Sequence, residues 1–572
     1  MRQLSRLLTI LLALLGVLLL GTAVLVFLAW PTVSQLVRWT GEEEPAARVR
    51  GVIALAQIWL QERPLQLDPY RPLPYTSRSP YGVNVFLEQE ADPTAVAKTL
   101  DMVKAAGITT VRQQFPWADI EIHGKGDFED RRNGPPRSAW AKYDNIMDQA
   151  EARGITVVAR LDTPPTWSRA DRAADETFGP PDNYEDYGDF VEAVVRRYKG
   201  RLHYVQIWNE PNIYPEWGLD APDPEAYTRL LDVAARRIRA VDPSIAIISA
   251  PLAPTLDHND RAMYDLDYLE RMLQAGAARS FDILGIIAYG LGSSPDDHRV
   301  VWHRTNFARP QLLRDSLVRN GAGDKPAWIM EMGWSAVPEG MDAPFGRVSE
   351  EQQGRYVVAA YRRIEEDYPW VGAAMLWFFR RPNDEWFNRP EGYFRLVNPD
   401  WSVQPAYAAL SAEATAPPRL QPGFQHITAP AYHWDGGWQS VTTSDALLGS
   451  WMQGSTGAVV SFPYEGTSAT LVTREGPGAG SVEVSVDGGA VERVNLTAAT
   501  ETRREIVLDE RPWPGQHTLT LRASGGDLVI EGVRVERNGE VWLRMGLSGL
   551  SVLAAVLGVS YAAWRVWGVR HA

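Results

Sequence analysis

The chain has 572 residues, of which 45% are hydrophobic and 22% charged; this is a globular composition and too much chain for one ordinary domain. The net charge of −14 argues against general nucleic-acid binding, and the lack of cysteine excludes disulfides, thiolate zinc sites and cysteine nucleophiles. The 22 tryptophans can stack on sugar rings, but such side chains also fill cores and lie at membrane interfaces.

Two apolar runs lie near the ends of the chain. Residues 7–29 carry no charge, and residues 545–564 form a second run after a β-rich segment. About 20 apolar residues cross a bilayer, so we expect an N-terminal transmembrane anchor within residues 1–30 and a C-terminal transmembrane helix at 545–564. A cleaved signal peptide and a buried helix are the respective alternatives.

Arginines flank both runs on their outer sides. Arg2 and Arg6 precede the first run, and Arg565 and Arg570 follow the second. Positive residues favour the cytoplasmic side, so we expect a cell-membrane protein with both termini cytoplasmic and the region between the spans extracytoplasmic. The membrane is thus an expected partner, and the sequence indicates no protein partner.

The chain between the two apolar runs divides into three regions that differ in sequence pattern. Residues 31–78 hold a short helical pattern and a proline-rich linker; the helix is expected either on the membrane or against the next domain. Residues 79–415 alternate strand-like and helix-like segments, with strands expected at 81–86, 108–114, 155–161, 204–210, 245–251, 282–290, 327–333 and 373–379. Eight such units predict a (β/α)8 TIM barrel, in which catalytic groups lie at the carboxyl ends of the strands.

Residues 420–540 are β-rich, with alternating apolar residues and an Asp487-Gly488-Gly489 turn signal. This pattern predicts a β-sandwich of the jelly-roll kind. Two interpretations stay open: a carbohydrate-binding module, or a packing domain before the second apolar run. The tryptophans that would form either a binding face or the core are Trp434, Trp438, Trp451 and Trp513.

Two glutamates end apolar strands of the expected barrel. Glu210 follows the fourth strand in "YVQIWNEP", and Glu331 lies near the end of the seventh in "WIMEMGWS". Strands four and seven face each other across a closed barrel. Two carboxyl groups over a cleft are what glycoside hydrolysis requires, with one acting as a proton donor and the other as a nucleophile or base.

With these two motifs, residues 79–415 resemble the retaining glycoside hydrolases of clan A, with a texture closest to families 39 and 5. The resemblance implies that Glu210 is the acid/base, Glu331 the nucleophile, and Asn209 a ligand of the sugar 2-hydroxyl. It also implies supporting residues on strands two, six and eight, namely Arg112, Tyr289 and Trp377. The β-rich region resembles the jelly-roll modules appended to many glycosidases.

Four further residues just beyond strand ends are candidates for sugar subsites, with an equal case for structural roles: Trp117, Asp162, Trp167 and Trp334. The loop after strand eight offers weaker candidates: Asn383, Asp384, Glu385 and Trp386. No Walker loop, zincin helix or EF-hand loop appears, so the sequence predicts neither a cofactor nor a metal.

The function expected from these features is that of a membrane-anchored, extracytoplasmic retaining β-glycosidase acting on a polysaccharide or oligosaccharide. One alternative is a catalytically silent glycan-binding or scaffold protein of a polysaccharide export or surface complex. Another is a transglycosylase that uses the same covalent intermediate. Sugar, linkage and endo or exo action depend on loop shape, which the sequence does not display.

Overall fold

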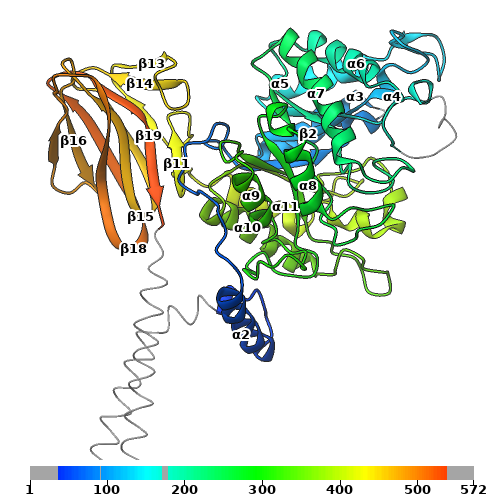
Figure 1. The fold of residues 1–572 in the computed structure, drawn as a ribbon, viewed down its shortest axis with the longest axis horizontal. Coiled ribbons are helices and arrows are strands. Elements are labelled where there is room, and N and C mark those ends of the chain that lie inside the picture. The colour runs from blue at the N-terminus through cyan, green and yellow to red at the C-terminus, as the bar shows by residue number, and fades with distance from the viewer. Residues whose placement is uncertain (1–36, 91, 170–177, 538–572) are drawn as a thin grey trace, which may run out of the picture.

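The computed structural model describes residues 37–90, 92–169 and 178–537, which form a parallel barrel followed by an antiparallel β-sheet domain (Figure 1). The apolar runs 7–29 and 545–564 lie outside the described residues. Within the three described ranges, no helix is both long and apolar enough to cross a membrane.

The barrel is one eight-stranded sheet with the strand order β7-β6-β5-β2-β1-β10-β9-β8. Neighbouring strands pair in parallel, and a bridge between Ile248 and Ile283 joins the two outer strands and closes the ring. The strands are β1 (Tyr81–Val85), β2 (Thr110–Pro116), β5 (Thr156–Asp162), β6 (Tyr204–Ile207), β7 (Ala246–Ile248), β8 (Leu284–Tyr289), β9 (Ala327–Gly333) and β10 (Val371–Leu376).

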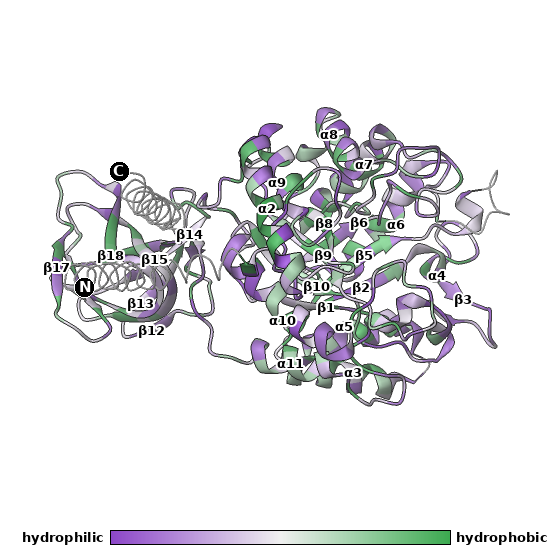
Figure 2. Cartoon of the chain, turned by 90° about the horizontal axis from the view of Figure 1, so that it is seen from below, coloured by the Kyte–Doolittle hydropathy of each residue, from purple (hydrophilic) through white to green (hydrophobic). Residues whose placement is uncertain are grey.

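Helices connect these strands and cover the outside of the barrel. Figure 2 shows the hydrophobic strands enclosed by helices that carry many hydrophilic residues. Side-chain caps start several of them, for example Asp223 on the amide of Ala226 and the reciprocal capping box of Ser349 with Gln352. The helices are α3 (Pro93–Ala105), α4 (Trp117–Ile120), α5 (Ala141–Glu151), α6 (Tyr184–Arg197), α7 (Pro224–Val241), α8 (Asp265–Gln274), α9 (Pro310–Arg319), α10 (Glu350–Asp367) and α11 (Pro405–Ala414).

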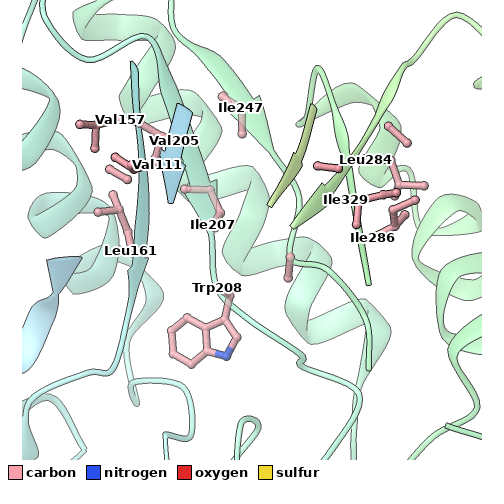
Figure 3. Close-up of a cluster of buried hydrophobic side chains, with 14 of the residues drawn as sticks. Val111, Val157, Leu161, Val205, Ile207, Trp208, Ile247, Leu284, Ile286 and Ile329 are labelled. Atoms are coloured by element: carbon pink, nitrogen blue, oxygen red, sulfur yellow. The ribbon is translucent and has the colours of Figure 1, made fainter. Parts of the chain in front are cut away.

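Alternation along the strands separates two layers of side chains. One set belongs to the large core that includes the helices, and Figure 3 shows part of it, with Val157, Val205 and Ile247 on neighbouring strands and Trp208 just past β6. The opposite set forms a smaller apolar cluster that includes Val158, Ile248 and Met330. Successive strand residues point to opposite faces, so this second cluster fills the barrel interior.

The expected strand positions are confirmed within a few residues, with two informative differences. β6 ends at Ile207 rather than at residue 210, because Trp208 (φ 71°) and Glu210 (φ 40°) leave the extended region. The fifth barrel strand is only Ala246–Ile248, shorter than the apolar pattern 245–251 suggested.

The second part is a nine-stranded antiparallel sheet whose two long strands, β15 and β18, pair along most of their length. This arrangement fits the expected sandwich. Its strands are β11 (Gly423–His426), β12 (His433–Asp435), β13 (Trp438–Thr442), β14 (Ser450–Gly454), β15 (Val459–Glu475), β16 (Ser481–Val486), β17 (Glu492–Asn495), β18 (Thr502–Ser524) and β19 (Leu528–Glu536).

Three of the four candidate tryptophans of this domain are tied to its core. Trp434 and Trp438 pack edge to face with centroids 4.9 Å apart, against the apolar cluster of the sheet. Trp451 is buried beneath Arg474, and Trp513 on β18 is half exposed. The packing interpretation therefore describes Trp434, Trp438 and Trp451, while sugar binding by the domain stays a prediction.

The N-terminal segment packs on the barrel, the second of the two placements left open above. Helix α2 (Pro45–Gln61) lies below α9 and α10 in Figure 1, and Arg63 beyond it pairs with Asp315 of α9. A cavity of about 1850 Å³ separates this segment from α9 and α10. Both Arg38 and Arg537 line it, so the two ends of the described chain meet at one face of the molecule.

Candidate active site

Arg112 organises the polar interior at the carboxyl end of the barrel. Its Nη1 donates to Glu331 Oε1 (2.7 Å) and to Asn84 Oδ1 (2.8 Å), and its Nη2 donates to Asn209 Oδ1 (2.6 Å). Its Nε donates to Gln206 Oε1 (2.7 Å). One guanidinium on β2 thus links side chains from β1, β6, the turn after β6 and β9, so the residues predicted on different strands do meet.

Glu331 accepts a hydrogen bond on each of its two carboxyl oxygens. Its side chain is buried, with Arg112 on one oxygen and the Tyr289 hydroxyl donating to the other at 2.8 Å. Burial, and next the Glu331 charge, raise the pKa of Tyr289 well above its usual value, so the phenol keeps the proton that it donates. Charge-assisted bonds to both oxygens fix the orientation of the carboxylate.

Glu210 has the opposite environment. In the described part of the chain no Lys, Arg or His nitrogen lies within ion-pair distance of it, and its one recorded side-chain contact is a long one, 3.5 Å from Asn209 Nδ2. Burial, followed by the nearby charge of Glu331, raises the pKa of Glu210 well above its ordinary range. A raised pKa favours the protonated form, which is the form that a general acid requires.

The backbone at Glu210 is also unusual. Its φ of +40° lies in the left-handed region, which costs a residue with a side chain about 1 kcal/mol or more. The turn is held by the amide of Glu210 on the Pro251 carbonyl (3.0 Å) and by Asn212, which bonds the loop after β7. This turn aims Glu210 at the mouth instead of along the strand, and it explains the abrupt end of the apolar run.

Sequence reasoning missed two amides that support Arg112. Asn84 lies on β1 and bonds the carbonyls of Met330 and Leu376, while Gln206 on β6 bonds the Trp208 carbonyl. The signal was available, because both are polar residues inside otherwise apolar strands at interior positions. They pair in register with Arg112 and Arg160 of neighbouring strands.

A second buried charge group was also missed. Arg160 of β5 bonds Asp162 at a very short distance and lies 3.8 Å from Glu216, in the loop after β6. Burial raises the pKa of Glu216 to about 7, although Arg160 acts in the opposite direction. Asp162, a predicted subsite residue, is 2% exposed and also accepts from Gln114 (2.8 Å). It therefore belongs to this charge group at the mouth.

For two of the candidate subsite tryptophans the structure supports the structural role, which the sequence left as an equal alternative. Trp117 and Trp334 are both completely buried. Trp117 stacks on Phe190 and donates to Glu121, and Trp334 packs on Phe307 and donates to the Ser293 carbonyl. Each tryptophan follows the end of its strand, as predicted. Its ring, however, is buried in the apolar layer between the strands and the helices, so neither ring can contact a sugar here.

Trp167 and Trp377 keep partly exposed faces. Trp167 donates to the Glu121 carbonyl (2.8 Å) and rests edge-on against Trp117. Trp377 follows β10, and its amide donates to the carbonyl of Met332, the residue after Glu331 (2.8 Å). This bond joins the Trp377 backbone to the strand that carries Glu331, and the role of Trp377 as the floor of the site stays a prediction. In the loop that follows, Asn383, Asp384 and Glu385 are exposed and Trp386 is half-buried.

The 1850 Å³ cavity contains none of these residues. It lies on the outer side of α9 and α10, where carboxylates pair with arginines, as Asp315 does with Arg63 and Glu366 with Arg537. The volume of this cavity therefore does not identify the active site. The site is identified by Glu210, which has no ion pair among the described residues, next to Glu331, which is bonded on both oxygens.

No protein-family model matches this sequence, and no curated protein matches it. Solved structures do: a family 39 glycoside hydrolase from the gut symbiont Bacteroides cellulosilyticus has 16% identity and a TM-score of 0.45, over 79% of this chain and 82% of that one. A glucosidase from Croceicoccus marinus has 14% identity and a TM-score of 0.45, over 80% and 98%.

The GH39 enzyme from Xanthomonas axonopodis pv. citri has 14% identity and a TM-score of 0.40, over 81% of this chain and 96% of that one. A GH5_18 structure from Streptomyces cattleya is also similar, so both families named from the sequence, 39 and 5, occur among the structures that this chain resembles. At these identities and TM-scores the likeness carries no weight for function, which rests on the geometry of the site.

Proposed function

We propose that the chain is a retaining β-glycosidase that cleaves O-glycosidic bonds of a polysaccharide or oligosaccharide. The observation that carries the proposal is the contrast between two neighbouring carboxyl groups: Glu210, which forms no ion pair among the described residues and has a raised pKa, and Glu331, which Arg112 and Tyr289 bond on both oxygens. Retaining hydrolysis needs one protonated and one ionised carboxyl at the same site.

In the proposed reaction, Glu331 attacks the anomeric carbon while Glu210 gives its proton to the departing glycosidic oxygen. The bond from the anomeric carbon to that oxygen breaks, and a covalent glycosyl-enzyme forms on Glu331. Glu210, now ionised, takes a proton from water, which attacks the same carbon and frees Glu331. In this proposal Asn209, which Arg112 bonds, binds the 2-hydroxyl, and Trp377 packs against the sugar ring.

The test is a pair of measurements on the purified full chain. We expect turnover of at least one member of a panel of neutral and acidic glycans, with the product released first in the anomeric configuration of the substrate, as followed by NMR. Arg279→Gln, an exposed change in the turn after α8, is a control that should leave turnover unaltered. Inversion of the anomer would contradict the two-step reaction.

A silent binding protein, the main alternative, does not need this electrostatic arrangement. A half-buried glutamate with a raised pKa and a left-handed backbone costs stability, and glycan binding alone gives no reason to keep it. Glycan binding without any turnover, by protein whose fold is intact, would support that alternative. Transfer of the glycosyl unit to added sugar acceptors would show that a sugar competes with water for the same intermediate.

We further propose that the chain is anchored in the cell membrane, with the barrel outside the cytoplasm. The support is the pair of apolar runs 7–29 and 545–564, together with the meeting of Arg38 and Arg537 at one cavity. Helix α2 also exposes an apolar stripe of Val49, Ile53 and Leu60 at this face. Protease added to spheroplasts should digest the region between the runs and spare tags on both termini; digestion of a terminal tag would overturn this topology.

A further inference from the structure

The loop after β10 contains a buried cation that the reaction described above does not use. Arg381 is 8% exposed, and its guanidinium carbon lies 3.6 Å from the ring centroid of Phe86 and 3.6 Å from that of Trp386. Phe86 directly follows β1, so the guanidinium lies between aromatic rings at the same end of the barrel as Glu210 and Glu331.

Arg381 lacks the partners that buried arginines have elsewhere in this structure. Among the described residues no carboxylate lies within ion-pair distance of it, its buried Nε has no acceptor, and Nη1 has only the amide oxygen of Gln89 at 3.3 Å. Its neighbour Arg380, by contrast, pairs with Glu90 and bonds the Pro399 carbonyl. Arg314 has no carboxylate either, but it donates to three backbone carbonyls.

A buried guanidinium without a bonded anion is unfavourable, because burial removes water and no hydrogen-bonded carboxylate replaces it. Burial lowers the pKa of Arg381 to about 10, although the charge of Glu88 acts in the opposite direction. A second cation increases the effect: the guanidinium of Arg389 lies 5.3 Å from the same Trp386 ring. The guanidinium groups of Arg381 and Arg389 thus lie against the same indole ring, and an anion bound there would neutralise both positive charges.

The position indicates what carries the anion. Phe86 packs edge-on against Trp377, with centroids 5.4 Å apart, and both rings belong to one aromatic cluster with Tyr289, whose hydroxyl bonds Glu331. Aromatic rings therefore continue from the cleavage site to Arg381. Sugar rings bind on such surfaces, and planar guanidinium groups donate two parallel hydrogen bonds to carboxylate or sulfate oxygens.

We propose that Arg381, assisted by Arg389, forms a subsite for an anionic sugar, so that the enzyme's glycan carries a carboxylate or sulfate group on a residue next to the cleaved bond. This inference rests on the proposed function for the location of the cleaved bond, but the binding of the anion is a separate property. Hydroxyl recognition alone would not require two cations.

Binding to the full chain carrying Glu331→Gln tests the proposal, since this protein binds glycans without turning them over. Trp386 lies against Arg381, so its fluorescence, together with calorimetry, can report occupancy. The ligands are matched oligosaccharides: a neutral series, a series with uronic acid residues, and a sulfated series. We expect one acidic series to bind on the order of tenfold to a hundredfold more tightly than the neutral one, which is the value of a hydrogen bond to a charged group.

Adding Arg381→Gln to this protein should abolish the preference and leave binding of the neutral series unchanged, whereas Arg279→Gln at the opposite end of the barrel should preserve it. If Arg381→Gln fails to fold, Arg389→Gln at an exposed position should still reduce the preference severalfold. The series that is preferred, uronate or sulfate, identifies the anion. Equal binding of neutral and acidic series, or a preference that survives both substitutions, would overturn the proposal even if the enzyme proves to be a glycosidase.

Discussion

The β-sheet domain and the mouth of the barrel each contain a glutamate shielded from solvent, and only one of the two carboxyl groups is neutralised. Glu531 on β19 is completely buried, and it accepts from Arg503 (3.1 Å), Arg474 (3.3 Å) and the amide of Leu447 (2.8 Å). Glu210 is half-buried at the mouth with no ion pair among the described residues, and the desolvation of its carboxyl group and the charge of Glu331 raise its pKa.

The difference distinguishes a carboxyl group that stabilises the fold from one that takes part in the reaction. A carboxylate that only stabilises a fold is surrounded by donors, because an unpaired buried charge is costly. A general acid must keep its proton, so its environment has to disfavour the charged form. Replacing Glu531 by glutamine should therefore lower stability and leave activity unchanged. Replacing Glu210 by glutamine should lower activity and raise stability at alkaline pH.

Glu331→Gln should give the largest effect. Without the attacking carboxylate the first step fails, and we expect a loss in kcat on the order of 10⁴–10⁶-fold, as for other residues that form a covalent intermediate. Steady-state assays with the best glycan of the panel measure it. In Glu331→Ala, azide should restore turnover and yield a glycosyl azide of inverted configuration, and a loss of less than about a hundredfold would contradict the assignment.

Glu210→Gln should cost roughly 10²–10⁴-fold on natural glycans and much less on substrates with an activated leaving group. The proton form of Glu210 is the active one, and its raised pKa means that activity falls as pH rises through that value. The alkaline limb of kcat/KM should therefore disappear in the variant. A limb that persists would assign it to another group, and equal losses on both substrate types would argue against proton donation.

The same substitution should stabilise the protein at alkaline pH. A folded-state pKa above the unfolded value contributes stability that is present at low pH and is lost as pH rises through the folded pKa. Glutamine carries no charge to bury, so Tm of Glu210→Gln should exceed that of the parent at pH 8–9 and approach it near pH 4.

Glu531→Gln should affect stability and leave catalysis intact. It leaves Arg474, 14% exposed, without its buried partner, a change worth up to about 3–5 kcal/mol when one member of a buried pair is lost. Calorimetry should show a lower Tm for the β-sheet domain, with kcat/KM unchanged at 25 °C. A loss of activity in folded protein would mean that the two parts are coupled.

Tyr289→Phe removes one of the two donors to Glu331. Because this hydrogen bond helps to fix the orientation of the attacking carboxylate, we expect kcat/KM at pH 7 to fall by about tenfold. Full activity of the variant would mean that Tyr289 only packs.

Glu216→Gln should have the smallest effect. Glu216 is a like charge that helps to raise the pKa of Glu210, so its removal lowers that pKa and shifts the alkaline limb of kcat/KM to lower pH. We expect a shift of at most about one pH unit, and Glu225→Gln, an exposed residue paired with Arg271 on α8, is the control. A shift to higher pH would contradict the geometry.

Much of this arrangement was predictable from the sequence. Apolar runs with polar ends located the eight strands, and the barrel rule placed Glu210 and Glu331 at one mouth. Arg112 and Tyr289 were named only through the resemblance to clan A glycoside hydrolases. Asn84 and Gln206 were also accessible to that reasoning, as polar residues at interior positions. The orientation of the Trp117 and Trp334 side chains was not predictable, because packing against Phe190 and Phe307 determines it.

Arg160, Glu216 and Arg381 were equally out of reach. Glu216 comes from a loop and meets Arg160 only through the turn after β6, and Arg381 acquires its meaning from the absence of a carboxylate around it in the described structure. The charge environment of these side chains depends on which residues lie next to them in the fold, and spacing along the chain does not reveal those contacts.

The different roles of Glu210 and Glu331 can be tested most directly by trapping the covalent intermediate. A 2-fluoro sugar with a good leaving group, matched to the preferred glycan, should inactivate the full chain with a stoichiometry of one. Peptide mapping should find the label in the segment "PAWIMEMGW", on Glu331. Label on Glu210 instead, or no label together with inversion of the anomer by the intact enzyme, would contradict the two-step reaction proposed for this site.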